Sequence, residues 1–172
     1  MIEVMSLFPS AIGIKDTRID TSKMLETCLQ IESEDHGLVH GEAKSTYTTE
    51  NNILEHSDFS IAKSVITSEV NIFGRQIGID MSNVKLGRSW FNIQKRGSTI
   101  MQHNHRRSVI SGAFYIYADK DAAPITFASP LMGHKMYEPA FGGTTDYDVE
   151  YTNIPAETGK LVLSSFLGKY MP

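Results

Sequence analysis

The sequence predicts an α+β chain that is mainly β, with helices in its first half and an antiparallel sandwich or jelly roll in its second half. Apolar residues recur at helical spacing in the first half and alternate at period two, among β-branched and aromatic residues, in the second. No helical pattern separates the later strands, which excludes the crossover helices that a parallel sheet requires. A chain of 172 residues fits a single domain over residues 1–172, helix-rich over 1–80 and jelly roll over 81–172.

Two amphipathic helices are expected in the first half. The first covers residues 21–33 and begins at the polar pair Thr21-Ser22, which suits an N-cap. Its apolar face would carry Cys28 and Leu29 into the core. The second covers residues 57–73, and Gly74 is its predicted stop. Residues 2–8 favour a short strand, 9–20 read as an irregular connection, and 34–55 are polar and small.

Six short strands are predicted in the second half, separated by Gly, Pro, Asn and Asp. They cover residues 84–94, 99–103, 108–117, 125–127, 148–154 and 160–166. The long glycine-rich connection at residues 129–146 carries His134, and a loop of this length suits a lid over a pocket as well as a passive surface excursion.

Composition excludes several classes of function. The net charge is −4 and the basic residues form no run, so a sequence-independent grip on nucleic acid is not expected. The single cysteine, Cys28, excludes an intrachain disulfide and a thiolate zinc cluster. No apolar stretch approaches the roughly 20 residues that span a bilayer, and the first residues lack a signal-peptide pattern. We therefore expect a cytosolic protein that does not bind membranes.

The residues that attract most attention are His103 and His105, which stand two positions apart ahead of a β-favouring run. On a strand, residues i and i+2 share one face, so two imidazoles placed this way could bind one metal ion. The alternative is a pair of structural, hydrogen-bonded histidines. The adjacent letters His-Asn-His do not reproduce a nuclease signature, because the residues that name that motif are dispersed along the chain.

Several short motifs lie on either side of this pair, and their order along the chain is informative. Together with the pair itself they comprise Trp90-Phe91-Asn92, Gly97, His103-Asn104-His105, the run from Ser108 to Tyr115, and Phe127-Ala128-Ser129-Pro130, with Leu7-Phe8-Pro9 near the start. This order resembles a family of 2-oxoglutarate and Fe(II)-dependent oxygenases in the double-stranded β-helix superfamily. The resemblance implies that fold for the strands, with the amino-terminal helices packed against it.

The same resemblance implies a chemistry. Fe(II) held by three protein ligands leaves positions for the keto acid 2-oxoglutarate and for dioxygen, and a bound substrate is hydroxylated. Carried over, His103 and His105 are the first two metal ligands. The third ligand of the family is a histidine in its closing segment, where this sequence has Lys169, which offers a metal no lone pair when protonated.

A substitute for the third ligand is therefore sought elsewhere in the chain. His134 is the first choice, followed by Asp146 and Asp148. The family's next strand usually carries a basic residue that pairs with the distal carboxylate of 2-oxoglutarate, and the printed sequence has no strand after Lys169. We therefore expect a jelly roll without its last strand. Five arginines are candidates for binding a substrate carboxylate: Arg75, Arg88, Arg96, Arg106 and Arg107.

Three functions follow for comparison. The first is an iron and 2-oxoglutarate-dependent dioxygenase acting on a small molecule or peptide of unknown identity. The second is a non-catalytic jelly-roll module for binding or structure, which Lys169 favours. The third is a cupin-like metalloprotein, which lacks the glutamate that a cupin motif places soon after the two histidines. A missing last strand would also expose a sheet edge that a second copy could cover, giving a homo-oligomer.

Overall fold

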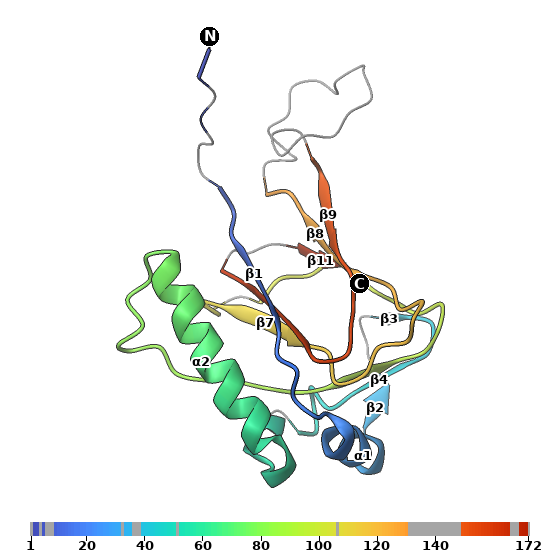
Figure 1. Ribbon diagram of the computed structural model, residues 1–172. Coiled ribbons are helices and arrows are strands. Elements are labelled where there is room, and N and C mark those ends of the chain that lie inside the picture. Colours follow the sequence, from blue (N-terminus) through green and yellow to red (C-terminus); the bar gives the residue numbers. More distant parts are fainter. Residues whose placement is uncertain are drawn as a thin grey trace.

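The architecture is taken from a computed structural model that describes residues 2–3, 5, 9–31, 33–35, 39–50, 52–105, 107–130, 149–165 and 169–171. Two α-helices lie in the first half, α1 (Ser22–Gln30) and α2 (Ser60–Gln76), and two 3₁₀ turns precede α2, η1 (Ile53–Glu55) and η2 (Ser57–Phe59) (Figure 1). The strands of the first half are β1 (Ile12–Asp16), β2 (Glu34–Asp35), β3 (Val39–His40) and β4 (Ala43–Ser45). Those of the second half are β5 (Asn92–Gln94), β6 (Thr99–Ile100), β7 (Ser111–Phe114), β8 (Ile125–Ala128), β9 (Tyr151–Ile154), β10 (Lys160–Ser164) and β11 (Lys169–Met171).

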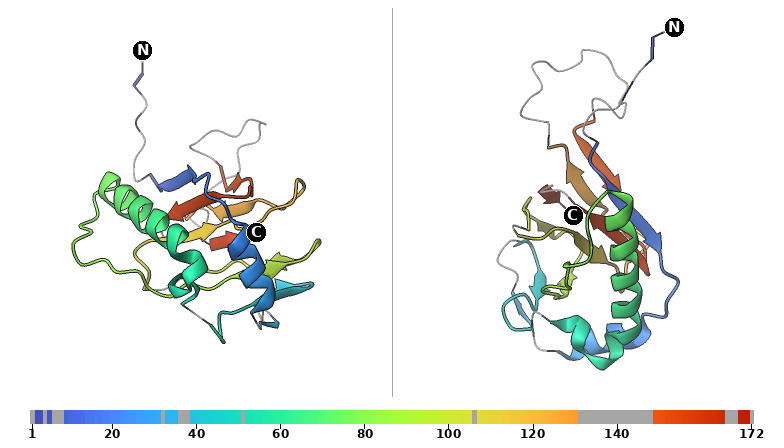
Figure 2. Two further views of the ribbon diagram at one scale, coloured as in Figure 1. Left: turned by 60° about the horizontal axis from the view of Figure 1, so that its bottom comes forward. Right: turned by 90° about the vertical axis from the view of Figure 1, so that its left-hand side faces the viewer.

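The strands form four small sheets, and every strand pairing in the described part of the chain is antiparallel. Their orders are β1-β10-β7, β11-β8-β9, β2-β4-β5 and β3-β6. Helix α2 runs along the β1-β10-β7 sheet, and α1 lies near the first turns of α2 (Figure 2). The expectation of an α+β chain with helices in its first half is therefore confirmed.

Strand β10 shows why these layers form. Its sequence Lys-Leu-Val-Leu-Ser is almost continuously apolar, as expected of a central strand that is covered on both faces. Leu161 and Leu163 pack with Phe73 of α2, while Val162 points to the other side and packs with Ile125 and Phe127 of β8. Alternation along one strand thus joins the helix layer on one face to the second sheet on the other.

A second core lies where the helices meet the segment before β5. Met24, Cys28, Ile53, Phe59 and Phe91 are all buried in one cluster. The prediction for α1 is right for Cys28 and wrong for Leu29, which is 66% exposed. Thr27 takes its place on the buried face, because its hydroxyl donates to Asp58 Oδ2 at 2.7 Å.

The ends of both helices differ from the sequence prediction. Thr21 makes no side-chain capping bond; Asp20 Oδ1 instead accepts from the backbone N–H and the hydroxyl of Ser22, at 3.0 and 2.7 Å. Helix α2 does not stop at Gly74 but continues to Gln76. Gly74 serves close packing, since a Cβ atom there would lie 2.2 Å from Met81 Sδ.

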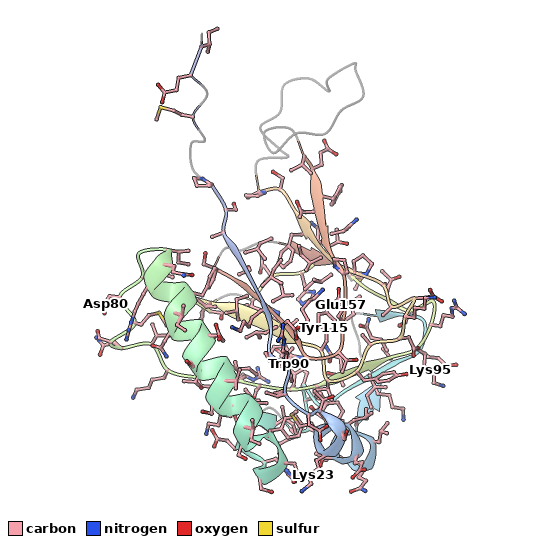
Figure 3. All side chains as sticks on the ribbon, viewed as in Figure 1. Lys23, Asp80, Trp90, Lys95, Tyr115 and Glu157 are labelled. Carbon is pink, nitrogen blue, oxygen red and sulfur yellow. The ribbon has the colours of Figure 1, made fainter. Side chains whose placement is uncertain are left out.

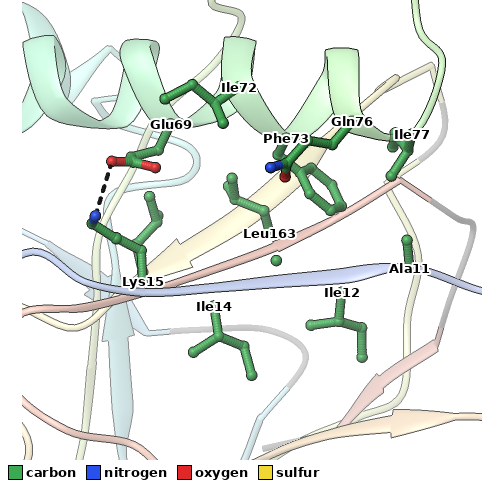
Figure 4. Close-up of a pocket in the computed structure, with 12 residues that line it drawn as sticks. Ala11, Ile12, Ile14, Lys15, Glu69, Ile72, Phe73, Gln76, Ile77 and Leu163 are labelled. Carbon is green, nitrogen blue, oxygen red and sulfur yellow. Dashed lines mark ion pairs between the residues drawn. The ribbon is translucent and has the colours of Figure 1, made fainter.

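An open apolar pocket of about 410 Å³ lies between α2 and the edge strand β1 (Figure 4). Ile12 and Ile14 line it from the strand and Phe73 from the helix. Lys15 and Glu69 form an ion pair of 3.5 Å at one end. Strand β1 itself was not predicted, because residues 9–20 read as irregular. Its short Ile-Gly-Ile pattern forms a strand through pairing with β10. Of residues 2–8, the described ones form no strand.

The jelly roll is where prediction and structure differ most. The described residues form separate sheets of two or three strands and no closed jelly roll. Several predicted strands are also shorter, since 84–94 reduces to β5, 99–103 to β6 and 108–117 to β7. The polar segment 34–55, for which no strand was predicted, contains β2, β3 and β4. Among the described residues, no helix combines the length and apolar character that crossing a bilayer requires.

Candidate functional site

The site is built where β4 and β5 end. These strands pair with Ser45 opposite Asn92, and the same register continues through Thr46, whose N–H donates to Phe91 O at 3.2 Å. One step further it places Tyr47 opposite Trp90, and the two rings meet edge to face with centroids 5.0 Å apart. Strand pairing between segments more than 40 residues apart thus brings these two rings together. Trp90 is labelled in Figure 3.

Arg88 is held against the same tyrosine. Its guanidinium carbon lies 4.4 Å from the centre of the Tyr47 ring, a cation–π distance. Nη2 donates to the Tyr47 carbonyl oxygen at 3.0 Å and Nη1 to the Tyr47 hydroxyl at 3.3 Å. Three interactions with one residue therefore fix the position of this arginine.

The two histidines follow β6 and lie close together. The prediction that they share a strand face is wrong, because β6 ends at Ile100 and β7 begins at Ser111. The irregular segment nevertheless brings their rings together, edge to face, with centroids 5.0 Å apart. The His105 ring also lies 5.5 Å from that of Trp90, so four rings succeed one another from Tyr47 to His103.

Hydrogen bonding and burial prepare both imidazoles to bind a cation. His103 Nδ1 lies 2.9 Å from the Met101 carbonyl oxygen. Because a carbonyl only accepts, Nδ1 is the donor in this bond, and a bond of this kind commonly orients a histidine that binds metal through Nε2. The pKa of His105 is lowered, first by burial and second by the charge of His103, so its neutral, metal-binding form prevails at neutral pH.

A pocket of about 360 Å³ opens beside His105. Tyr47, Arg88, Trp90 and Asn104 form the rest of its lining. His105 therefore lines a pocket whose other walls are two aromatic rings, an amide and a cation.

Comparison with protein families assigns the region that carries these groups. Residues 88–166 match the model of the family described as "Putative 2OG-Fe(II) oxygenase". The resemblance read from the sequence is thus confirmed over this segment, which contains Arg88, Trp90 and both histidines. A comparison with curated proteins finds no match.

The oxygenase family implies Fe(II), and the histidines can be tested against that metal. Imidazole nitrogen suits iron, and ring centres 5.0 Å apart are close enough for both rings to reach one ion at nitrogen–metal bonds of about 2.1 Å once their nitrogens turn toward it. Within the described ranges, no cluster of three or more His, Cys, Asp or Glu residues completes a metal site. Two donors therefore fit the metal, and the third is not among the described side chains.

The structure describes the position of Lys169 but not those of the candidate third ligands. Lys169 begins β11, where it pairs with Ala128 of β8. His134, Asp146 and Asp148 lie outside the described residues. Their role as ligands therefore stays a prediction.

The other described arginines singled out in the sequence are not part of this pocket's lining. Arg96 pairs with Asp121 at 3.7 Å, Arg75 and Arg107 are exposed, and Arg106 lies outside the described residues. Asn92 Oδ1 accepts a hydrogen bond from the Ser45 hydroxyl at 2.6 Å, which secures the β4–β5 pair.

The tyrosines of the segment around β7 are not part of the pocket lining either. Tyr115 packs against the cluster of Ile125, Phe127 and Val162, and Tyr117 is 60% exposed. Sequence reasoning missed Tyr47, whose place in the site depends on the register of strands distant in sequence. The one signal available was its aromatic character next to a polar, irregular stretch.

Proposed function

We propose that this chain is an Fe(II)- and 2-oxoglutarate-dependent dioxygenase that hydroxylates an organic substrate, with His103 and His105 as two of its metal ligands. The observation that carries the proposal is the pair of imidazoles, 5.0 Å apart, within a segment that matches the oxygenase family. When bound, the metal and keto acid supply the oxidising chemistry. The chain supplies two oriented nitrogen donors and a pocket at their side.

The two histidines have distinct parts in this proposal. His103 presents Nε2, because the Met101 carbonyl holds the proton on Nδ1. His105 is kept neutral by burial, so binding of a cation at this ring does not have to displace a proton at neutral pH. Trp90 lies against His105 and limits the positions of its ring.

The fold that we propose for this function is a double-stranded β-helix. Its support is that the named strands of the described residues pair antiparallel and that the β1-β10-β7 and β11-β8-β9 sheets pack through Val162, Ile125 and Phe127. Two packed antiparallel sheets are the basis of a jelly roll. A cytosolic location and a small-molecule or peptide substrate, with no nucleic-acid or membrane partner, belong to the same proposal, supported by the net charge of −4 and the absence of a second cysteine.

The test begins with metal binding. The full chain is titrated with Fe(II) under anaerobic conditions, beside a His103→Ala/His105→Ala variant and a His56→Gln control. His56 caps η2 through a bond from the Asp58 N–H to Nδ1 and so reports on loss of an unrelated histidine. We expect the parent and the control to bind Fe(II) at least about tenfold more tightly than the double variant. Equal affinity in all three proteins would contradict the assignment of the ligands.

Turnover separates the two leading functions. Consumption of 2-oxoglutarate in air by the iron-loaded chain, absent in the double variant, is the result expected of a dioxygenase. The second candidate is a non-catalytic jelly-roll module, which Lys169 favours because this residue begins β11 where the family has its third ligand. Iron binding without consumption of 2-oxoglutarate would support that alternative.

A further inference from the structure

Arg88 is a cation held in place at the wall of the pocket beside His105. Both terminal nitrogens donate to Tyr47, and the guanidinium stacks on the same ring. Arginine carries five N–H donors, so this anchoring uses only part of its capacity. No carboxylate among the residues that the structure describes forms an ion pair with it.

The surroundings of Arg88 differ from those of the other fixed cations. Arg18, Lys63 and Lys95 each face a carboxylate, whereas the partners of Arg88 are an aromatic ring, a hydroxyl and a carbonyl. A guanidinium in such a setting keeps its full charge, and its planar fork matches a carboxylate. Arg88 is exposed and lines the pocket, so its charge is available to an anion that enters there.

The remaining walls suit the body of an organic molecule. Trp90 and Tyr47 contribute aromatic rings, and Asn104 contributes an amide that both donates and accepts. A volume of about 360 Å³ lies within the range of roughly 300–1,000 Å³ typical of small-molecule sites. The pocket can thus hold a ring or apolar group as well as the anion that Arg88 would bind.

We propose that this pocket binds the primary substrate, and that the substrate is a small organic carboxylate whose carboxyl group binds Arg88 while its apolar body lies against Trp90. The substrate role rests on the proposed function, since it places the molecule beside the metal ligand His105. Tyr47 is a positioning residue in this arrangement, because it holds the guanidinium and does not need to touch the substrate.

The test uses the single tryptophan of the chain, Trp90, as a fluorescent reporter within the pocket. The metal-free full chain is titrated with benzoate and with its neutral counterpart benzamide, and each affinity is checked by calorimetry. We expect benzoate to bind at least about tenfold more tightly than benzamide, because one charge-assisted hydrogen bond to Arg88 stabilises the complex by that ratio. Equal affinity for the two probes would overturn the proposal.

Variants then identify the cation. Arg88→Gln should weaken benzoate binding about tenfold or more and leave benzamide unchanged, whereas Arg88→Lys should retain part of the affinity because it keeps the charge but loses the planar fork. The matched control is Arg96→Gln, which removes an arginine that pairs with Asp121 outside the pocket. Unchanged benzoate affinity in Arg88→Gln would contradict the assignment.

The role of Tyr47 is tested by Tyr47→Phe, which retains the ring but removes the hydroxyl that accepts from Nη1. We expect Tyr47→Phe to bind benzoate more weakly than the parent does. Added to Arg88→Gln, the same change should lower the affinity for benzoate little or not at all. Fully additive losses would contradict a positioning role acting through Arg88.

A metal-binding experiment distinguishes failure of this substrate proposal from failure of the proposed function. Mn(II) serves as a redox-stable probe of the histidine pair, and Arg88→Gln should bind it like the parent. Binding of benzoate through Arg88 in a parent chain that binds no Mn(II) would overturn the proposed function and leave the carboxylate site in place. Binding of 2-oxoglutarate with Mn(II), lost in Arg88→Gln, together with no benzoate binding, would assign the site to the keto acid and overturn the substrate proposal.

Discussion

Arg107 shows how the segment after the histidines is strained at one residue. Its φ angle is +73°, and Ser108 N–H donates to His105 O at 3.3 Å across the turn. For a residue with a side chain, the left-handed region costs roughly 1–2 kcal/mol, which glycine avoids. The turn that follows the candidate metal ligands therefore stores strain.

The first prediction concerns this turn. Arg107→Gly should raise the free energy of unfolding by about 0.5–1 kcal/mol, since relief of the positive φ exceeds the entropy that glycine adds to the unfolded chain. The control is Arg96→Gly, at an exposed turn position without a positive φ, which should lower or leave unchanged the free energy of unfolding. Urea denaturation measures both. Destabilisation by Arg107→Gly would show that the side chain itself holds the turn.

Cys28 supplies a second prediction at this scale, through its ionisation. Burial raises the pKa of its thiol from 9.0 to about 12. The folded state thus holds the thiol proton more tightly than the unfolded chain. The contribution of the protonated thiol to the free energy of unfolding is therefore fully present below pH 9 and is lost as the pH rises toward 12. Each unit of pKa difference corresponds to roughly 1.4 kcal/mol.

The measurement compares urea unfolding of the parent and of Cys28→Ala across the alkaline range. The variant should start less stable, because it leaves a small cavity beside Met24 and Phe59, but should lose less stability above pH 9. If the free energies of unfolding of the two proteins fell in parallel with pH, ionisation of the Cys28 thiol would not contribute to the loss of stability. Reaction of the native thiol with a disulfide reagent should likewise be slow and follow unfolding.

The residue scale also shows what sequence could predict about the site. His103 and His105 were identified because a two-residue spacing limits how far apart two side chains can lie, whatever the backbone does. Their partners could not be inferred, because Trp90 meets Tyr47 only through the pairing of β4 with β5, two strands that lie more than 40 positions apart in the sequence. Local pattern contains no such information.

At the scale of elements, the sequence predicted helix α2 but not the residue at which it ends. The apolar stripe over residues 57–73 identifies the helix, but Gly74 was taken as a stop from its intrinsic preference alone. Tertiary packing reverses that preference, since Met81 folds back onto the helix and occupies the space of a side chain at position 74. The glycine with positive φ beyond the end of the helix is Gly78, at +81°.

This packing leads to a third prediction. In an exposed helix, Gly→Ala stabilises by about 1 kcal/mol. Here Gly74→Ala should instead destabilise by about 1–3 kcal/mol, because its Cβ would lie 2.2 Å from Met81 Sδ and 2.9 Å from Met81 Cγ. Thermal and urea unfolding measure the change.

A double-mutant cycle identifies the cause. Met81→Ala leaves a cavity and destabilises by itself, but Gly74→Ala added to it should be neutral or stabilising, because the clash is gone. The same loss from Gly74→Ala in both backgrounds would exclude the contact with Met81 as its source.

For the whole molecule, the predicted class holds because it follows from periodicity, whereas the predicted closure of a jelly roll does not appear among the described residues. Periodicity reports which face of a strand is buried but not which strand lies beside it. The pairing that the structure shows also crosses the predicted division at residue 80. Strand β1 pairs with β10, β3 with β6 and β4 with β5, so each of these pairs joins the first half to the second.

This interleaving leads to the last prediction, which concerns a fragment of residues 81–172. Such a fragment loses β1 from the edge of β10 and loses α2 from its face, which exposes Leu161 and Leu163 together with an unpaired strand edge. We therefore expect it to lack a cooperative unfolding transition, whereas the full chain unfolds cooperatively. Near-ultraviolet circular dichroism and urea denaturation of the two proteins provide the measurement.

A point variant tests the same dependence in the intact chain. Phe73→Ala removes the side chain through which α2 packs on Leu161 and Leu163, and truncation of a buried phenylalanine costs about 3–5 kcal/mol. Its control is Ile61→Ala, at a position on the same helix that is 67% exposed and should change stability little. If the fragment folds cooperatively on its own, and Phe73→Ala matches this control, then the strands after residue 80 form their own stable unit and the helices are only a cover. The opposite result, a fragment that does not unfold cooperatively and a Phe73→Ala variant less stable than the control, would mean that the β1-β10-β7 sheet depends on the first half of the chain for its stability.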